Sequence, residues 1–263
     1  MSLAVISAII MTVLLIVMLV MGASISIAIG LSSAVAMLCM LPVDISLITS
    51  AQRIFTGANS FSLIAIPFFI LAGNIMNNGG IAVRLVNVAK VLSGRMPGAL
   101  AQSNVVANMM FGAISGSGAA AAAAIGGTMG PLEEQEGYDK VFSTAVNIAS
   151  APTGMLIPPS NLMIVYSTVA GSVSVAALFV AGYVPGILWG IGVMALVAYF
   201  AKKKGYVSEE RVDLKTALHV IVDAIPSLLL IVIIIGGILG GVFTATEGSA
   251  IAVVYATVLS LIY

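Results

Sequence analysis

The chain has 263 residues, of which 60% are hydrophobic and 8% are charged, and its 10 basic and 10 acidic residues give a formal net charge of zero. A soluble domain carries about 25% charged residues. The composition therefore excludes an ordinary soluble domain and predicts an all-α polytopic membrane protein. The balanced charge also gives no reason to expect a nucleic-acid partner.

A helix that crosses a bilayer needs about 20 largely apolar residues. Residues 1–20 lack the basic n-region and cleavage pattern of a signal peptide, so we interpret them as a first membrane helix. A last apolar run from 250 stops at Tyr263 and would reach only about 21 Å, so we expect the chain to end inside a helix. The expected spans are 1–20, 24–42, 60–77, the broken segment 141–170, 175–200 and 224–243.

A hairpin is predicted between Pro97 and Pro131, because Ser115-Gly116-Ser117-Gly118 interrupts this apolar stretch at its middle. The arm from Ala119 to Gly130 would give about 18 Å of helix, which is too short to cross. Non-helical backbone at membrane depth is tolerated only inside protein or beside a watery cavity. The hairpin is therefore expected to be re-entrant, with a polar or ionic site at its tip.

The positions of Lys and Arg favour the same topology, because basic residues are retained in short cytoplasmic loops. If 97–131 enters and returns, nine of the ten basic residues share one side and only Arg53 lies opposite. Two short full crossings would give the same parity, and arm length favours re-entry. Segments 81–93 and 211–225 are expected to be amphipathic helices along the inner interface. The expected outer loops are 43–59, 171–174 and 244–249.

A broken helix is predicted around Ala151-Pro152-Thr153-Gly154-Met155-Leu156-Ile157-Pro158-Pro159-Ser160, because three prolines and a glycine forbid regular helix there. The first half-helix should end near Ser150, and the second should begin at Ser160 and Asn161, which are good N-cap residues. A hairpin tip beside a broken helix is the arrangement with which secondary transporters bind ions and substrates. Packing of small residues is the alternative explanation of either feature alone.

Asp, Glu, Lys, Arg and His are absent between Pro97 and Leu132 and from Val141 to Ala201. This disfavours a proton relay and favours a cation held by neutral oxygens, of which Na+ is the expected one. Farther along, Thr244 and Glu247 have the spacing of a capping box at the start of the last helix.

Several runs of the sequence closely resemble the large membrane subunit of tripartite ATP-independent periplasmic (TRAP) transporters. The resemblance implies an elevator-type, Na+-driven importer of carboxylates such as C4-dicarboxylates or sialic acids. It also implies a bacterial inner-membrane location, a small membrane (Q) subunit and a periplasmic substrate-binding (P) protein. The runs are IPFFILAGNIMNNGGIAVRL (66–85), GRMPGALAQSNVVANMMFGAISGSGAA (94–120), IGGTMGPLEEQEGYDK (125–140), APTGMLIPPSN (151–161) and GVFTATEGSAIAVVYA (241–256).

The resemblance further implies site residues. Ser160 and Asn161 would lie near the substrate or ion. The second half of the family's inverted repeat is absent from the sequence, so one cation site and part of the substrate site should be missing. The implied Na+ ligands are Ser103, Ser115, Gly116, Ser117, Asn147, Pro152, Thr153 and Gly154.

Three parts are expected: scaffold-like helices with an interfacial helix (1–96), a transport-domain hairpin and broken helix (97–170), and membrane helices with a cytoplasmic linker (171–263). Two other functions compete with transport. An intramembrane serine hydrolase could use Ser117, but the only histidine, His219, is predicted at the membrane surface, where it could not act as the base. A structural subunit is the third possibility, and it would show no Na+-dependent uptake.

Overall fold

The computed structural model describes residues 2–171, 173–206 and 213–263, and the regular elements in these ranges are all helical. The chain divides into two compact units, residues Met1–Ser60 and Phe61–Tyr263. Each is described by itself. The three-part division predicted from the sequence stays a prediction.

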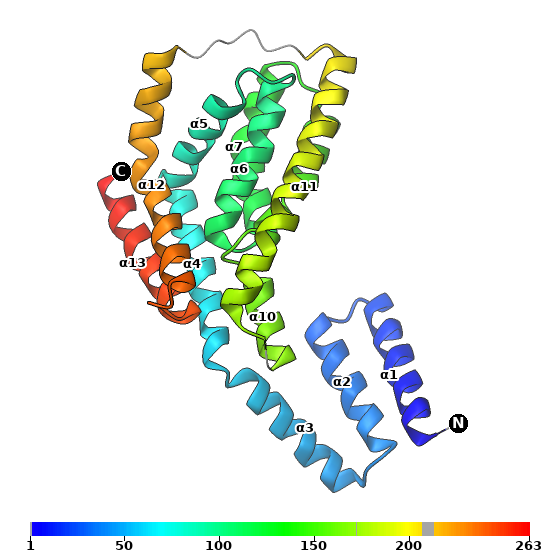
Figure 1. Ribbon diagram of the computed structural model, residues 1–263. Helices are drawn as coiled ribbons and strands as arrows, with labels where there is room; N and C mark the ends of the chain where they lie inside the picture. Colours follow the sequence, from blue (N-terminus) through cyan, green and yellow to red (C-terminus); the bar gives the residue numbers. More distant parts are fainter. Residues whose placement is uncertain (1, 172, 207–212) are drawn as a thin grey trace. The chain divides into compact units, whose positions relative to one another are not determined.

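The first unit consists of α1 (Leu3–Val20), α2 (Ile25–Leu38) and α3 (Val43–Ala58) (Figure 1). Helix α2 has 14 residues and is shorter than the span 24–42 predicted for it. Pro42 explains the early end, because a proline disfavours helical backbone at the residue before it. The segment 43–59, predicted as an outer loop, is largely helical, since α3 begins directly after Pro42. Its position on the outer side stays a prediction.

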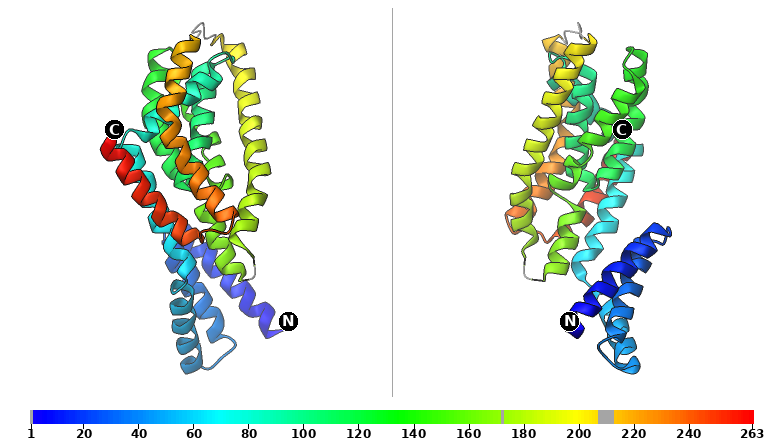
Figure 2. Two further views of the ribbon diagram at one scale, coloured as in Figure 1. Left: turned by 60° about the vertical axis from the view of Figure 1, so that its left-hand side comes forward. Right: turned by 90° about the vertical axis from the view of Figure 1, so that its right-hand side faces the viewer.

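The second unit contains the remaining helices, several of which run side by side in Figures 1 and 2. In the described ranges, five helices are long and apolar enough to cross a membrane, or six if one bent pair is a single span. The helices are η1 (Phe61–Ile64), α4 (Ala65–Asn78), α5 (Ile81–Ser93), α6 (Ala99–Ser115), α7 (Gly118–Gln135), α8 (Lys140–Ser150), α9 (Thr153–Leu156), α10 (Asn161–Ala170), α11 (Val175–Lys204), α12 (Leu214–Leu239) and α13 (Ala245–Ile262).

Helix α12 corrects two sequence predictions at once. The interfacial helix 211–225 and the span 224–243 form one continuous helix through Pro226, although residues 207–212 lie outside the described ranges. One buried face explains the continuity, because it runs unbroken past the proline at helical spacing. Its residues are Ala224, Ser227, Leu230, Ile234 and Ile238.

The last helix begins at the predicted capping box, ahead of the apolar run that starts at 250. Thr244 and Glu247 form the expected capping box, which starts α13 at Ala245 and gives it 18 residues. That length corresponds to about 27 Å rather than about 21 Å. The prediction that this helix is too short to cross is therefore wrong, and α13 packs along α4 and α12.

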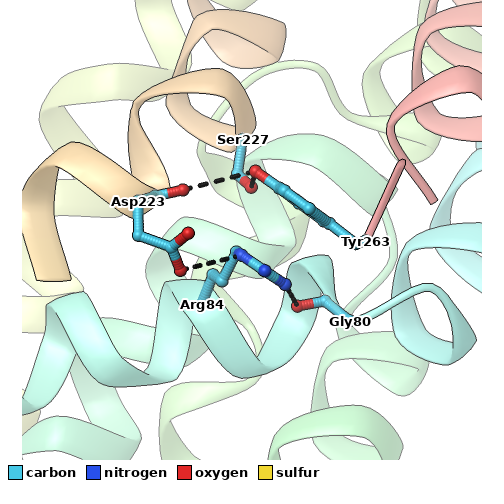
Figure 3. Close-up of polar contacts among 5 residues, drawn as sticks. All are labelled: Gly80, Arg84, Asp223, Ser227 and Tyr263. Atoms are coloured by element: carbon cyan, nitrogen blue, oxygen red, sulfur yellow. Dashed lines mark hydrogen bonds and ion pairs between the residues drawn. The ribbon is translucent and has the colours of Figure 1, made fainter. Parts of the chain in front are cut away.

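Helix α5 occupies the predicted segment 81–93, with one face buried against α6 and α12. Figure 3 shows the polar contacts around Arg84, near the start of this helix. Arg84 Nε lies 2.9 Å from Asp223 Oδ2, and the guanidinium stacks on the Tyr263 ring, 3.3 Å from its centroid. The Tyr263 hydroxyl donates to the Asp223 carbonyl oxygen over 3.3 Å. These contacts connect α5, α12 and the end of α13.

The two ends of the hairpin α6–α7 meet the same end of α11. The backbone N–H of Gly98 donates to the Tyr206 carbonyl oxygen over 3.1 Å, and that of Asp139 donates to the Tyr206 hydroxyl over 3.0 Å. Lys204 Nζ lies 2.8 Å from Asp139 Oδ2 and lowers the pKa of that carboxyl. Residues 97–98 and 139 are therefore neighbours, as the predicted hairpin requires.

The hairpin arm α7 is longer than expected, because the helix continues through Pro131 to Gln135 and has 18 residues. Its length of about 27 Å no longer separates re-entry from a short crossing. Re-entry into the membrane stays a prediction, because the charge distribution fits a re-entrant hairpin and two short crossings equally well.

Labelling of single cysteines tests this topology. With Cys39 replaced by Ala, Arg95→Cys, Lys140→Cys and Lys203→Cys should all react with a membrane-impermeant thiol reagent from one side only. Arg53→Cys should react only from the other side, because it is the one basic residue that the topology places opposite. Labelling of Arg95→Cys and Lys140→Cys from opposite sides would contradict the hairpin.

Candidate functional site

The hairpin turns over two residues at its tip. Helix α6 ends at Ser115, and Gly116 adopts a left-handed backbone conformation with φ of 62°, which a glycine takes without strain. Ser117 then caps α7, its hydroxyl accepting a hydrogen bond from the Ala120 N–H over 3.3 Å. The tip therefore brings the carboxyl end of α6 and the amino end of α7 to one point.

The predicted break between α8 and α10 is confirmed, with a bend of 46° between the two halves. Helix α8 ends at Ser150, and Ser160 caps α10 by accepting from the Met163 N–H over 3.4 Å. The sequence predicted an unwound stretch between them. The structure instead has one helical turn there, α9, which follows Pro152. A proline at the start of a helix loses no intrahelical hydrogen bond there.

The tip and the break lie against each other. The backbone N–H of Asn161 donates to the Gly116 carbonyl oxygen over 3.1 Å, and the Asn161 side-chain amide donates to the Ser115 carbonyl oxygen over 3.4 Å. A Cβ on Gly116 would lie only 3.0 Å from the Pro159 carbonyl oxygen. The two features singled out in the sequence therefore form one site.

Glycines permit this close approach. A Cβ on Gly112 of α6 would lie 2.1 Å from the Gly154 Cα of α9, and a Cβ on Gly118 would lie 2.9 Å from the Ala151 carbonyl oxygen. Both contacts are with backbone atoms, which cannot rotate away. The hairpin therefore packs on the broken helix with backbone against backbone.

The structure brings most of the predicted ligand residues together and places two of them, Ser103 and Asn147, away from the others. Ser103 lies 12 positions before Ser115 on the same helix, which corresponds to about 18 Å, and its hydroxyl donates to the Ala99 carbonyl oxygen. Asn147 ties α8 to the hairpin by donating to the Ala122 carbonyl oxygen over 2.9 Å. The residues at or beside the meeting point are Ser115, Gly116, Ser117, Pro152, Thr153, Gly154, Ser160 and Asn161.

The polar atoms at the meeting point are neutral oxygens. Thr153 Oγ1 donates to the Ser150 carbonyl oxygen over 2.6 Å and keeps its lone pairs. Asn161 Oδ1 is buried and has no partner. Carboxyl ends of α6 and α8 contribute partial negative charge, and amino ends of α7 and α10 contribute partial positive charge. The arrangement can hold a cation beside an anion.

A second buried polar cluster lies farther down the hairpin, and the sequence analysis missed it. Asn108 Nδ2 is within 2.8 Å of Asn104 Oδ1, 3.0 Å of Asn147 Oδ1 and 2.9 Å of Ser150 Oγ. Asn104 Nδ2 in turn donates to Glu133 Oε1 over 3.2 Å. The signal in the sequence was the pair of asparagines four residues apart, which places two amides on one helix face.

Glu133 belongs to this cluster and is completely buried. The sequence analysis found no ionisable residue between Pro97 and Leu132, which is correct, but it took no account of the carboxyl immediately after that interval. Glu133 lies outside the helices long and apolar enough to span a membrane, and burial raises its pKa to about 7. A cavity of about 530 Å³ adjoins it, lined also by Asn104, Lys140, Ser143 and Asn147.

The sequence matches a known family of transporters. Residues 12–263 match the family model for the tripartite ATP-independent periplasmic transporter, DctM component. The chain is 56% identical to the uncharacterized protein YgiK of Salmonella typhimurium over 94% of its length and 57% of that protein. It is 41% identical to the isethionate TRAP transporter permease protein DctMQ of Oleidesulfovibrio alaskensis, over 92% of this chain and 38% of the relative.

The third relative is the C4-dicarboxylate TRAP transporter large permease protein DctM of Vibrio cholerae. It is 42% identical over 92% of this chain and 53% of its own length. The chain therefore spans between about a third and three fifths of the length of these relatives.

Substitution of Gly112 by Ala should destabilise the contact between hairpin and broken helix. The new methyl group would overlap the Gly154 backbone, and overpacking of this kind costs about 1–3 kcal/mol. We expect a lower thermal unfolding temperature of the purified chain in detergent. Gly192→Ala, on an exposed face of α11 with no atom within 4 Å, is the matched control and should leave the temperature unchanged or raise it. Equal stability of both variants would contradict the packing.

Substitution of Asn108 by Leu should remove an amide whose two N–H hydrogens serve the neighbouring oxygens of Asn104, Asn147 and Ser150, and so leave up to two of these acceptors without a donor. Each buried orphan costs about 1–3 kcal/mol, so a clear decrease in the thermal unfolding temperature is expected. Asn78→Ala, which removes an exposed amide that bonds only to the Asn74 carbonyl oxygen, should change stability by less than about 0.5 kcal/mol. An Asn108→Leu variant as stable as the parent chain would show that the cluster contributes little.

Proposed function

Because the chain belongs to the DctM component family of tripartite ATP-independent periplasmic transporters, we propose that it imports an organic acid together with Na+. The observation that carries the proposal is the contact between the hairpin tip and the helix break through Gly116 and Asn161. Elevator-type movement of the hairpin and broken helix belongs to the same proposal.

The chemistry of the meeting point supports Na+ as the coupling ion. Hard cations take oxygen ligands, and the groups available there are carbonyls, the Ser115 and Thr153 hydroxyls and the unpartnered Asn161 Oδ1. No described ionisable side chain from 98 to 131 competes for this role. We assign Ser115, Gly116, Ser117, Thr153 and Asn161 as the principal candidate ligands, with Ser117 Oγ also capping α7, and Ser103 as a structural residue of α6.

The substrate is proposed to be a small organic anion. The amino ends of α7 and α10 present partial positive charge at the site, which suits a carboxylate. Relatives carry the names of C4-dicarboxylate, sialic acid and isethionate transporters, which are all organic acids. The Ser160 side chain is buried and already bonded to the Met155 carbonyl oxygen and the Met163 N–H. Its predicted substrate contact is therefore assigned to neighbouring Asn161.

The family also indicates a cellular location, a functional class and partners. Its members are permeases of the bacterial inner membrane and not enzymes, so the serine hydrolase alternative is set aside. Ser117 instead has a structural task as the cap of α7. A small membrane subunit and a periplasmic binding protein are the proposed partners, and the fused name DctMQ of one relative supports the first of these.

Removal of hydroxyl ligands at the tip tests the cation site. Ser115→Ala, Ser117→Ala and Thr153→Ala should each raise the Na+ concentration for half-maximal uptake by roughly threefold to tenfold, because each removes an oxygen from the site. The measurement is uptake of a labelled organic acid by proteoliposomes that contain the complete transporter.

Ser93→Ala is the matched control, since Ser93 is equally buried but bonds only within α5. It should leave the Na+ dependence unchanged. The cation assignment fails if all three tip variants behave like this control. Uptake that needs no Na+ at all would remove the coupling proposal itself.

A further inference from the structure

The carboxyl of Glu133 presents a chemical problem that the transport site does not explain. Its side chain is 0% exposed, Oε1 has one donor in Asn104, and Oε2 has no partner. A buried charge with an incomplete set of hydrogen bonds is costly, and such a group normally becomes neutral instead. Glu133 is thus arranged for the protonated form.

In the described ranges no cation forms an ion pair with Glu133. Lys140 and Glu134 line the same cavity, and Tyr138 follows α7, but none of them forms an ion pair with Glu133. In the described ranges the ion pairs are Arg84–Asp223 and Lys204–Asp139. From α6 and α8, the groups that face the carboxyl are the uncharged side chains of Asn104 and Ser143.

Ser143 of α8 also faces the carboxyl, and Ser143 Oγ and Glu133 Oε2 are both buried without a hydrogen bond. A Ser143 hydroxyl that donated to Oε2 would favour the ionised carboxyl, whereas a protonated Oε2 would itself donate to Ser143 Oγ. Only the protonated form also removes the buried charge.

A chain of amides leads from this carboxyl to the transport site. Asn104 bonds to Glu133 and to Asn108, and Asn108 is within hydrogen-bond distance of Ser150 Oγ. The Ser150 carbonyl oxygen in turn accepts from Thr153 at the helix break. A change in the charge of Glu133 thereby reaches the residues proposed to bind Na+ through side chains with fixed partners.

We propose that Glu133 is a proton-binding site beside the α7–α8 cavity, and that Asn104 and Asn108 link its protonation to the helix break. The first part stands independently of the transport function, whereas the link to Na+ rests on the proposed function. By thermodynamic reciprocity, a proton that alters Na+ affinity must have its own affinity altered by Na+.

The direction of the pH effect on stability follows from burial. The pKa in the folded chain, about 7, lies above the ordinary value near 4.5. The folded chain thus binds the extra proton between these values, so its stability should decrease as the pH rises toward about 7 and then level off. Glu133→Gln keeps the shape, stays neutral and should lack this decrease.

Infrared difference spectroscopy of the purified chain tests the proton site directly. Titration across neutral pH should show the carbonyl stretch of one protonated carboxylic acid, which disappears as the pH rises and is absent from Glu133→Gln. Glu134→Gln is the matched control, because Glu134 is adjacent and lines the cavity but is exposed, and it should keep the signal. A carboxyl that stays ionised throughout, held by Lys140 or a metal cation, would overturn the proposal.

The coupling is tested by repeating the titration in NaCl and in choline chloride. A midpoint that moves with Na+ in the parent chain, and a smaller movement in Asn108→Leu, would support the link. An infrared signal that ignores Na+, in a transporter whose uptake depends on Na+, would overturn the coupling alone. If the complete transporter showed no Na+-dependent uptake while the infrared signal was present, the transport proposal would be refuted and the proton site would stand.

Discussion

The second unit depends on the hydrogen bond from the Asn161 N–H to the Gly116 carbonyl oxygen, which joins the helix break to the hairpin tip. Two helices stop inside an apolar protein, and each stop leaves backbone groups that lipid cannot satisfy. The hairpin tip and the helix break satisfy each other. The same interruptions that create this problem also gather the carbonyls, hydroxyls and helix ends that an ion and an anion require.

Close packing makes this mutual satisfaction possible. Gly112 and Gly154 allow the backbones of α6 and α9 to touch, and Gly118 does the same for α7 beside Ala151. In a membrane, where lipid is as apolar as the protein interior, such backbone contact replaces the hydrophobic effect as the source of helix association. The small residues therefore allow both close packing and formation of the site. Packing and site formation, the two explanations considered for them, are not exclusive.

The polar interior has two parts with different chemistry. The meeting point holds neutral oxygens, whereas the cluster of Asn104, Asn108 and Glu133 holds amides and one carboxyl. The amide groups join the two parts, because an asparagine can donate on one side and accept on the other.

The sequence by itself determined the membrane class, the family, the hairpin turn at Gly116 and the break with its cap at Ser160, because glycine, proline and N-cap residues act on the backbone next to them. It did not determine the continuity of α12 past Pro226 or the burial of Glu133. These features depend on which residues distant in sequence cover a helix face, and burial, not residue type, decides whether a carboxyl is solvated or must find partners inside.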